Sequence, residues 1–290
     1  MVRRLLFPSV LVLVVLGALS LPAEMGPLLP LLSTGITLVV VLIAERWLPR
    51  VGRRAEPSET RTDLMYLGVT GALDSIVRAT LVGAVVALAA VLPLRTLAGL
   101  PLWLGAPGVL LVSGFGDYWA HRFGHEWPWW WRLHAVHHAP HRMVALNNYR
   151  LHPLDLVLKI SFAAVPVLLL GFGPEAIAIA AVIKSVVVTF QHADIDLRHG
   201  PLNFLFATNS VHRWHHSARV EEANSNYGGV LSLFDLAFGT YRVPAEDLEP
   251  ERMGLFDEKR YPIHTVLRAT AAPWCWGRCV EGVSELDRDS

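Results

Sequence analysis

Histidine is the residue type most able to carry chemistry in this chain of 290 residues. All 13 histidines lie at or after position 121, and eight of them form three tight clusters. The clusters are His121-x-x-x-His125, His134-x-x-His137-His138 and His212-x-x-His215-His216. Because residues three and four apart share one face of a helix, each cluster would aim its imidazoles at one point. Imidazole is a ligand for iron, zinc, copper and nickel, and eight imidazoles are enough to hold two ions.

Other metal and catalytic motifs do not fit this sequence. A zinc protease needs His-Glu-x-x-His, but after His125-Glu126 the second histidine is replaced by Trp129. Carboxylate-bridged di-iron bundles use Glu and Glu-x-x-His pairs, and almost no carboxylate stands at the matching places here. A nucleophilic hydrolase would need a Gly-x-Ser-x-Gly elbow, which the chain lacks. The sequence therefore favours a metal centre built from histidine nitrogens.

The elements that must position these clusters are apolar helices. Hydrophobic residues make up 53% of the chain and charged residues 17%, and the mean hydropathy is +0.40, which indicates an integral membrane protein. A helix needs ~20 apolar residues to cross a bilayer, and several runs approach that length. The runs are 5–23, 26–44, 64–94 with Asp74 and Arg78 inside it, 101–116, 160–174, and 176–190 with Lys184 inside it.

We expect an all-α fold from these runs. It would be a membrane helical bundle of about four spanning helices plus a re-entrant hairpin over 154–190, with a cytoplasmic histidine-rich helical cap. Gly171-Phe172-Gly173-Pro174 would break the two helices of the hairpin. The first run follows Arg3-Arg4 and could instead be a signal peptide that is cleaved.

Arginine positions predict the orientation in the membrane. Arg3 and Arg4 precede the first run, and residues 45–61 contain five arginines, whereas the other short loops carry only Glu24 and Arg95. The positive-inside rule then places both termini and the 45–62 loop in the cytoplasm, in the cell (inner) membrane of the organism. Four crossings bring His121 to the cytoplasmic side, and the hairpin returns His192 to that same side. All histidine clusters would therefore lie on one face of the membrane.

Longer motifs surround the clusters. They are Asp117-Tyr-Trp-Ala-His121-Arg-Phe-Gly-His125, Trp131-Arg-Leu-His134-Ala-Val-His137-His138, Phe190-Gln-His192-Ala-Asp194, His212-Arg-Trp-His215-His216-Ser217, and Asn226-Tyr227-Gly228 followed by Phe238-Gly239-Thr240-Tyr241-Arg242. In order and spacing, over about residues 111–242, these motifs resemble the fatty acid hydroxylase/sterol desaturase superfamily. Its members are membrane di-iron oxygenases that hydroxylate or desaturate lipid chains and sterols with O2 and two electrons from a redox partner. The resemblance implies two iron ions, O2 as co-substrate and a membrane lipid as substrate.

The resemblance also implies roles for individual residues. The metal ligands would be His121, His125, His134, His137, His138, His212, His215 and His216, with His192 as the ninth. His152, in a His-Pro segment that does not always bind metal in the family, would be either a further ligand or a hydrogen-bonding neighbour of one. Asp117, one turn before His121, could accept the other N–H of that ring, or it could be an ordinary charge at the membrane interface. Asp194 stands where the family more often has Asn, so its carboxylate could bind metal directly, and we expect it to point into or beside the pocket.

Two classes of function fit these features. One is an O2-dependent di-iron oxidoreductase that hydroxylates or desaturates a lipid, and the other is a histidine-lined membrane metal carrier without oxidation activity. A carrier should place its ligands along a path inside the membrane, whereas each cluster here lies just outside an apolar run, which favours the enzyme. The chain contains no cytochrome b5-like or ferredoxin-like segment, so electrons should come from a separate protein of one of these kinds and its reductase. A net charge of zero argues against nucleic-acid binding.

The same features divide the chain into three parts. Residues 1–62 would form the N-terminal transmembrane helices and a cytoplasmic linker. Residues 63–242 would form the catalytic bundle with the di-metal site, and residues 243–290 a cytoplasmic C-terminal tail.

Overall fold

The computed structural model describes residues 1–52, 56–89, 96–246, 248–256 and 261–279, so the end of the predicted tail, 280–290, lies outside the described residues. The long helices are α1 (Val2–Leu19), α2 (Leu29–Trp47), α3 (Pro57–Ala89), α4 (Leu102–Glu126), α5 (Pro128–His138), α6 (Pro153–Leu170) and α7 (Pro174–Gln191). The shorter helices are η1 (Ala23–Leu28), η2 (Ala145–Tyr149), α8 (Leu202–Leu205), α9 (Asn209–His215), α10 (Val220–Ala223), α11 (Leu233–Phe238), α12 (Val266–Ala271), η3 (Ala272–Cys275) and α13 (Trp276–Cys279). Extended pairing in the described parts is limited to isolated bridges, and the predicted all-α class is confirmed.

Five helical stretches are long and apolar enough to cross a membrane. They are Val2–Leu19, Ala23–Trp47, Pro57–Ala89, Pro153–Leu170 and Pro174–Gln191. Large apolar side chains such as Ile36, Val39 and Val86 are exposed on these helices, as expected of helices that face lipid rather than water. Helix α4 was also expected to span, but it is not among the five. Its glycines and its polar residues from Asp117 onward lower its mean hydropathy.

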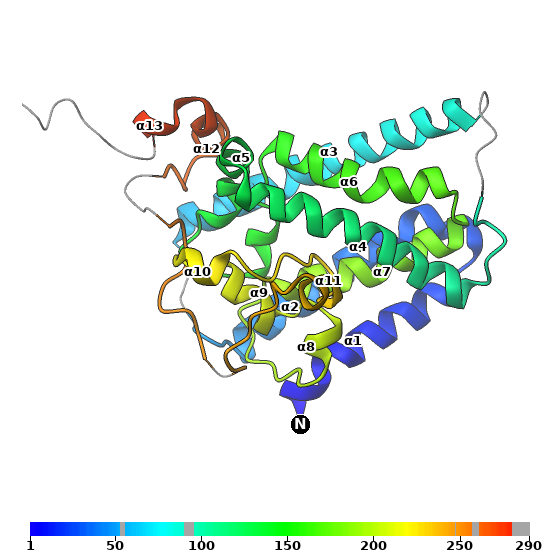
Figure 1. The fold of residues 1–290 in the computed structure, drawn as a ribbon. Helices are drawn as coiled ribbons and strands as arrows, with labels where there is room; N and C mark the ends of the chain where they lie inside the picture. The colour runs from blue at the N-terminus through cyan, green and yellow to red at the C-terminus, as the bar shows by residue number, and fades with distance from the viewer. Residues whose placement is uncertain (53–55, 90–95, 247, 257–260, 280–290) are drawn as a thin grey trace, which may run out of the picture.

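Helix α7 lies at the centre of the bundle, where it contacts α1, α2 and α4 (Figure 1). Its Val187 and Phe190 are buried together with Phe7 of α1 and Val41 of α2 in one apolar core. Helix α3 lies at the edge and packs against α6. The end of α7 that carries the last turn before His192 is therefore held rigidly by three neighbouring helices.

Two glycines shape the hairpin of α6 and α7 and its fit against α4. At Gly116 of α4 a Cβ would lie 2.0 Å from the carbonyl oxygen of Phe162 in α6, so only glycine allows these helices to approach so closely. Gly171 ends α6 in the left-handed region at φ +63° and reverses the chain. Each helix of the hairpin has 18 residues, which is longer than the short dipping pair that we expected and long enough to cross a membrane. Because the chain reverses, both outer ends of the hairpin lie at the same end of the bundle.

Short helices and loops cover that end of the bundle. Helix α9 contacts α7, and α11 contacts α4, so the segment after His192 folds back against both long helices (Figure 1). The predicted cap of short helices is therefore present.

Candidate metal centre

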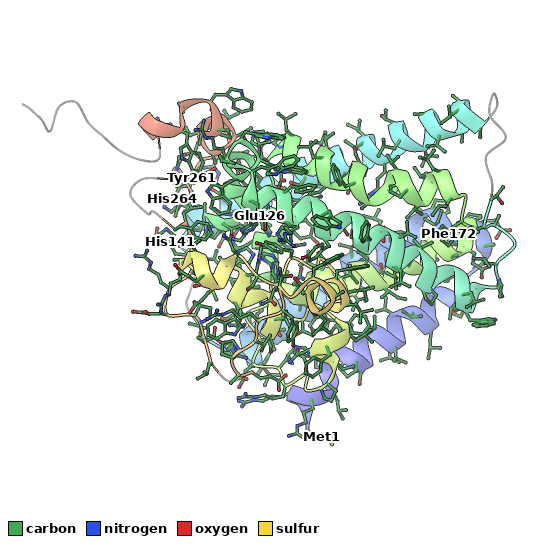
Figure 2. All side chains as sticks on the ribbon, viewed as in Figure 1. Met1, Glu126, His141, Phe172, Tyr261 and His264 are labelled. Atoms are coloured by element: carbon green, nitrogen blue, oxygen red, sulfur yellow. The ribbon has the colours of Figure 1, made fainter. Side chains whose placement is uncertain are left out.

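Nine histidine side chains meet beneath the cap, and all of them are buried. Helix α4 supplies His121 and His125, α5 supplies His134, His137 and His138, the C-cap of α7 supplies His192, and α9 with its C-cap supplies His212, His215 and His216. They form a five-histidine group (His121, His125, His134, His138, His215) and a four-histidine group (His137, His192, His212, His216). Within each group the candidate ligand atoms all lie within 4.8 Å of one another. Glu126, labelled in Figure 2, marks the end of α4 beside this centre.

Helical geometry explains which rings share a group. Residues four apart are offset by only ~40° around a helix of 3.6 residues per turn. His134 and His138 therefore point together into the five-histidine group, while His137 points into the other. On α9 the same rule sends His212 and His216 to the four-histidine group and His215 to the five-histidine group. Helices α5 and α9 thus contribute to both groups and hold them side by side.

Ring nitrogens within each group face one another at short distances. The Nε2–Nε2 distances are 3.0 Å for His121 and His134, 3.1 Å for His125 and His138, 3.0 Å for His192 and His212, and 3.0 Å for His212 and His216. Two imidazole nitrogens bound to one ion at ~2.1 Å and at right angles to each other would be ~3.0 Å apart. The spacing of the rings therefore suits nitrogens that share a metal ion.

Hydrogen bonds at the opposite nitrogen fix the tautomer of several rings. The Nδ1–H of His121 donates to the carbonyl oxygen of Tyr227 at 2.8 Å, and that of His134 donates to Asp155 Oδ2 at 2.9 Å. A neutral ring that donates from Nδ1 keeps a lone pair on Nε2. His121 and His134 therefore face each other with two lone pairs, which repel each other unless a cation lies between them. The donor set of the five-histidine group thus fits a metal ion.

The remaining hydrogen bonds at Nδ1 are unevenly distributed between the two histidine groups. In the five-histidine group, His215 Nδ1 donates to the Ser225 carbonyl at 2.7 Å, and His125 Nδ1 lies 3.2 Å from Asn224 Oδ1. In the four-histidine group, His137 Nδ1 donates to the Arg150 carbonyl at 3.3 Å. The buried Nδ1 atoms of His138, His192 and His212 have no hydrogen-bond partner among the described residues.

Burial keeps these imidazoles neutral. It lowers the pKa of every histidine on α5 and α9 by desolvating the charged form, and charged neighbours lower it further. The pKa values of His192 and His215 fall to about 3. Neutral imidazole is the form that binds metal. Both groups consist of nitrogen donors alone, a set that suits iron, zinc or copper better than calcium or magnesium.

Asp155 is a functional neighbour that the sequence analysis missed. Its carboxylate is fully buried at the start of α6, where it accepts from His134 Nδ1 and, at 2.8 Å, from Trp130 Nε1. A carboxylate behind a ligating histidine orients the ring and raises its basicity. The available signal was a lone acid at the head of an apolar run, since charged groups at such positions need a partner.

Asp117 does not have the role predicted for it. Although it lies one turn before His121, its carboxylate pairs with Lys184 of α7. The acceptor for His121 is instead the Tyr227 carbonyl, which comes from the cap. The two side chains leave α4 in different directions, so sequence spacing alone gave the wrong partner.

The prediction that Asp194 points to the metal centre is also wrong. Its two carboxylate oxygens accept from the backbone N–H groups of Val51 and Gly52, each at 2.9 Å, and it belongs to neither histidine group. It fastens the segment after α2 to the chain just beyond His192. Its carboxylate is therefore occupied by backbone donors rather than aimed at the metal centre.

His152 lies outside both groups and caps α6. Its Nδ1 accepts from the Leu154 N–H at 3.1 Å, and its Nε2 donates to the Thr270 carbonyl at 3.1 Å. Both ring nitrogens are thus engaged. His152 is therefore neither a metal ligand nor a hydrogen-bonding neighbour of one, and both predicted roles are wrong.

Fold and site together define a helical membrane protein with a buried polyhistidine centre. Residues 106–240 match the fatty acid hydroxylase family, and the resemblance drawn from the motifs is confirmed. No solved structure matches the chain.

Three characterised relatives are similar to this chain. The ornithine lipid hydroxylase of Rhizobium tropici is 37% identical over 135 residues, which cover 47% of this chain and 41% of that protein. The alkylglycerol monooxygenase of Xenopus tropicalis is 29% identical over 56% of this chain and 34% of its own length. The human alkylglycerol monooxygenase is 30% identical over 46% of this chain and 29% of its own length. The chain therefore spans less than half of each relative.

Proposed function

We propose that this protein is a membrane-bound di-iron oxygenase that hydroxylates a C–H bond of a lipid. The observation that carries the proposal is the pair of buried, neutral histidine groups inside the part of the chain that matches the fatty acid hydroxylase family. Hydroxylation is favoured over desaturation because the relatives are named as a hydroxylase and monooxygenases. The metal-carrier alternative is not favoured, since the histidines form one closed centre rather than a path across the bundle.

In this proposal the nine histidines are the iron ligands. One ion would be held by the five-histidine group and the other by the four-histidine group. Bound iron would supply the O2 activation that an unactivated C–H bond requires. Asp155 and the Tyr227 carbonyl would hold two rings in the tautomer that presents Nε2 to the ion. The burial of all nine rings would keep bulk water away from the reacting atoms.

The proposal places the metal centre and both termini at the cytoplasmic face of the inner membrane. Arg3 of α1 pairs with Asp196 at 2.7 Å, and the Arg50 N–H donates to the Asp194 carbonyl at 3.2 Å. The arginine-rich N-terminus and the arginine-rich loop therefore lie at the same end of the molecule as His192, which supports a shared cytoplasmic side. A separate cytochrome b5-like or ferredoxin-like protein and its reductase would deliver electrons from there. The division into residues 1–62, 63–242 and 243–290 is part of the same proposal.

Metal analysis and lipid profiling test the activity. We expect two iron ions per chain in the purified protein and, in an expressing strain, a lipid that gains one oxygen atom only when O2 is supplied. Loss of two hydrogens from the lipid would indicate desaturation instead. A His215→Ala strain is the control for lipids that other enzymes oxidise. Unchanged lipids together with an absence of bound iron would contradict the proposal.

Reporter tags test the orientation. Tags at Arg54 and at the C-terminus should report cytoplasm, and a tag near Ala98 should report the outside. A C-terminus on the outer side would contradict the shared cytoplasmic face.

A further inference from the structure

Two short helices of the cap, α8 and α11, present large apolar side chains to the outside. On α8, Phe204 is 55% exposed and Leu205 is 41% exposed. On α11, Leu233, Leu236 and Phe238 are each about 40% exposed, at 39%, 43% and 42%. The two helices are joined by the bridge between Phe206 and Leu231 and by the Ser232 N–H, which donates to the Leu205 carbonyl at 3.1 Å. Their exposed side chains therefore belong to one connected unit.

This apolar surface continues onto the long helices. On one side Phe115 of α4, itself 48% exposed, packs against Phe234 and Phe238 of α11 with ring centroids 5.7 and 6.4 Å apart. On the other side Phe206, just after α8, packs at 5.9 Å against the buried Phe7 of α1, so a core contact attaches α8 to a helix that is able to cross a membrane. A contiguous exposed apolar surface of this kind is normally covered by another protein or by lipid.

Polar contacts locate this surface near the end of the bundle. Arg3 pairs with Asp196, and the Arg198 N–H donates to the Arg3 carbonyl at 2.7 Å, so charged groups gather where α1 begins. Helix α8 starts only four residues after Arg198. Along α4, Phe115 lies six residues before His121, ~9 Å toward the apolar end of the helix at 1.5 Å per residue. Helix α11 is thus on the membrane side of the metal centre.

We propose that α8 and α11 lie in the plane of the membrane, with Phe204, Leu205, Leu233, Leu236 and Phe238 in contact with acyl chains at the level of the head groups. The attachment of α8 to α1 and the exposed Phe115 beside α11 identify the occupant as lipid, because a bilayer that covers α1 would extend over the cap helices that lie beside it. The inference concerns membrane contact alone and holds whichever metal or reaction the centre serves.

Helix α11 also connects this membrane surface to the metal centre. From its inner side, Asp235 accepts from the N–H groups of Tyr227 and Gly228 at 2.7 and 2.8 Å and from Thr240 Oγ1 at 2.7 Å. The Tyr227 carbonyl in turn accepts from His121 Nδ1. One six-residue helix therefore faces lipid on one side and holds the loop that orients a metal-centre histidine on the other.

Depth-dependent quenching tests the contact. Leu205→Cys and Leu236→Cys would be made separately in a protein whose Cys275 and Cys279 are replaced by alanine, labelled with a small fluorophore and placed in phosphatidylcholine vesicles. Acyl-brominated lipid should quench both labels roughly threefold more strongly than aqueous iodide does, as expected for in-plane helices. The matched control is Arg219→Cys near α10, whose side chain is 60% exposed and which iodide should quench instead.

Two results would overturn the inference. Iodide quenching at Leu236→Cys equal to that at Arg219→Cys would place α11 in water. Protection of both labels from both quenchers would mean that protein, such as a second copy of this chain, covers the surface. Because these measurements require neither iron nor turnover, they succeed or fail independently of the proposed oxygenase activity.

Discussion

The two histidine groups differ in how firmly the surrounding protein holds them. In the five-histidine group, four rings have an outer partner at Nδ1: Tyr227 for His121, Asn224 for His125, Asp155 for His134 and Ser225 for His215. In the four-histidine group His137 has one longer contact, to the Arg150 carbonyl, while the Nδ1 atoms of His192 and His212 have none among the described residues. One half of the centre is thus oriented in advance, and the other is freer to adjust.

The difference follows from which elements surround each group. Helix α5 and the start of α6 place Asp155 behind the five-histidine group, and the loop 224–227 closes over it with two carbonyls and an amide. The four-histidine group depends on His192 at the end of α7 and on one side of α9, where few polar groups stand behind the rings. Outer partners orient metal ligands, so we expect the five-histidine ion to be bound more tightly.

Loss of a proposed ligand should have the largest effect. His137→Ala and His215→Ala remove one ring from the four- and five-histidine groups respectively, and each should lower turnover roughly 100-fold or more because the proposed oxygenase chemistry would need both ions. Both proteins should remain in the membrane, since a missing ligand opens a coordination position and not an apolar core. Bound iron should fall from two ions to about one, as measured by elemental analysis.

His264→Ala is the control for these substitutions, because His264, labelled in Figure 2, is exposed and belongs to neither histidine group. Near-normal turnover in either ligand variant would refute the assignment of that group.

The next largest effect should come from Asp155→Asn. It replaces the carboxylate behind His134 and should weaken metal binding to the five-histidine group roughly 10–100-fold, because the ring loses its charged acceptor. Titration of the metal-free protein with Co(II) measures both sites. We expect the affinity of the five-histidine site to fall and that of the four-histidine site to stay unchanged. Asp117→Asn is the matched control, since that carboxylate pairs with Lys184 and contacts no histidine of the centre. Equal losses in the two variants would remove Asp155 from its proposed role.

Acid should destabilise the metal-free protein through both groups. The pKa values of His192 and His215 are lowered to about 3 in the folded state, against ~6.5 in the unfolded chain. Above pH ~6.5 both rings are neutral in the folded and in the unfolded state, so they cost the folded protein no stability. As pH falls from 6.5 toward 3 the unfolded state alone binds protons, and ~1.4 kcal/mol of stability is lost per pH unit for each histidine.

Thermal unfolding of the metal-free protein between pH 7.5 and 5.5 measures this loss. His192→Gln and His215→Gln should each flatten the acid limb, one for each group. A melting temperature that does not change over this range would show that the rings already carry protons when folded.

The smallest expected effect is that of Asn224→Ala. The contact of Asn224 with His125 is a neutral hydrogen bond of 3.2 Å, worth ~1 kcal/mol, so metal affinity of the five-histidine group should fall about fivefold. The same Co(II) titration measures it, with Ser225→Ala as control, because Ser225 contributes its backbone carbonyl and keeps it in the variant. A loss as large as that of Asp155→Asn would mean that neutral and charged outer partners matter equally here.

The sequence by itself determined the helices and the residues that meet at the centre. Apolar runs dictate membrane helices because backbone groups in lipid must be satisfied within the helix, and spacings of three and four place histidines on one helical face. These are local properties, so the all-α class and the positions of the histidine clusters could be read directly. His192 stands alone, and the resemblance of its flanking residues to a known family supplied what spacing could not.

Only the tertiary structure decided how the histidines divide and what stands behind them. Helical spacing separates His137 from His134 and His138, but it does not say which other histidines each of them meets; the packing of α5 against α4 and the placing of His192 and α9 beside it decide that. The same dependence explains the errors for Asp117, Asp194 and His152, whose partners Lys184, Val51 and Thr270 are 67, 143 and 118 positions away in the chain. A side chain's direction relative to distant elements is set by packing, and that information is absent from short-range spacing.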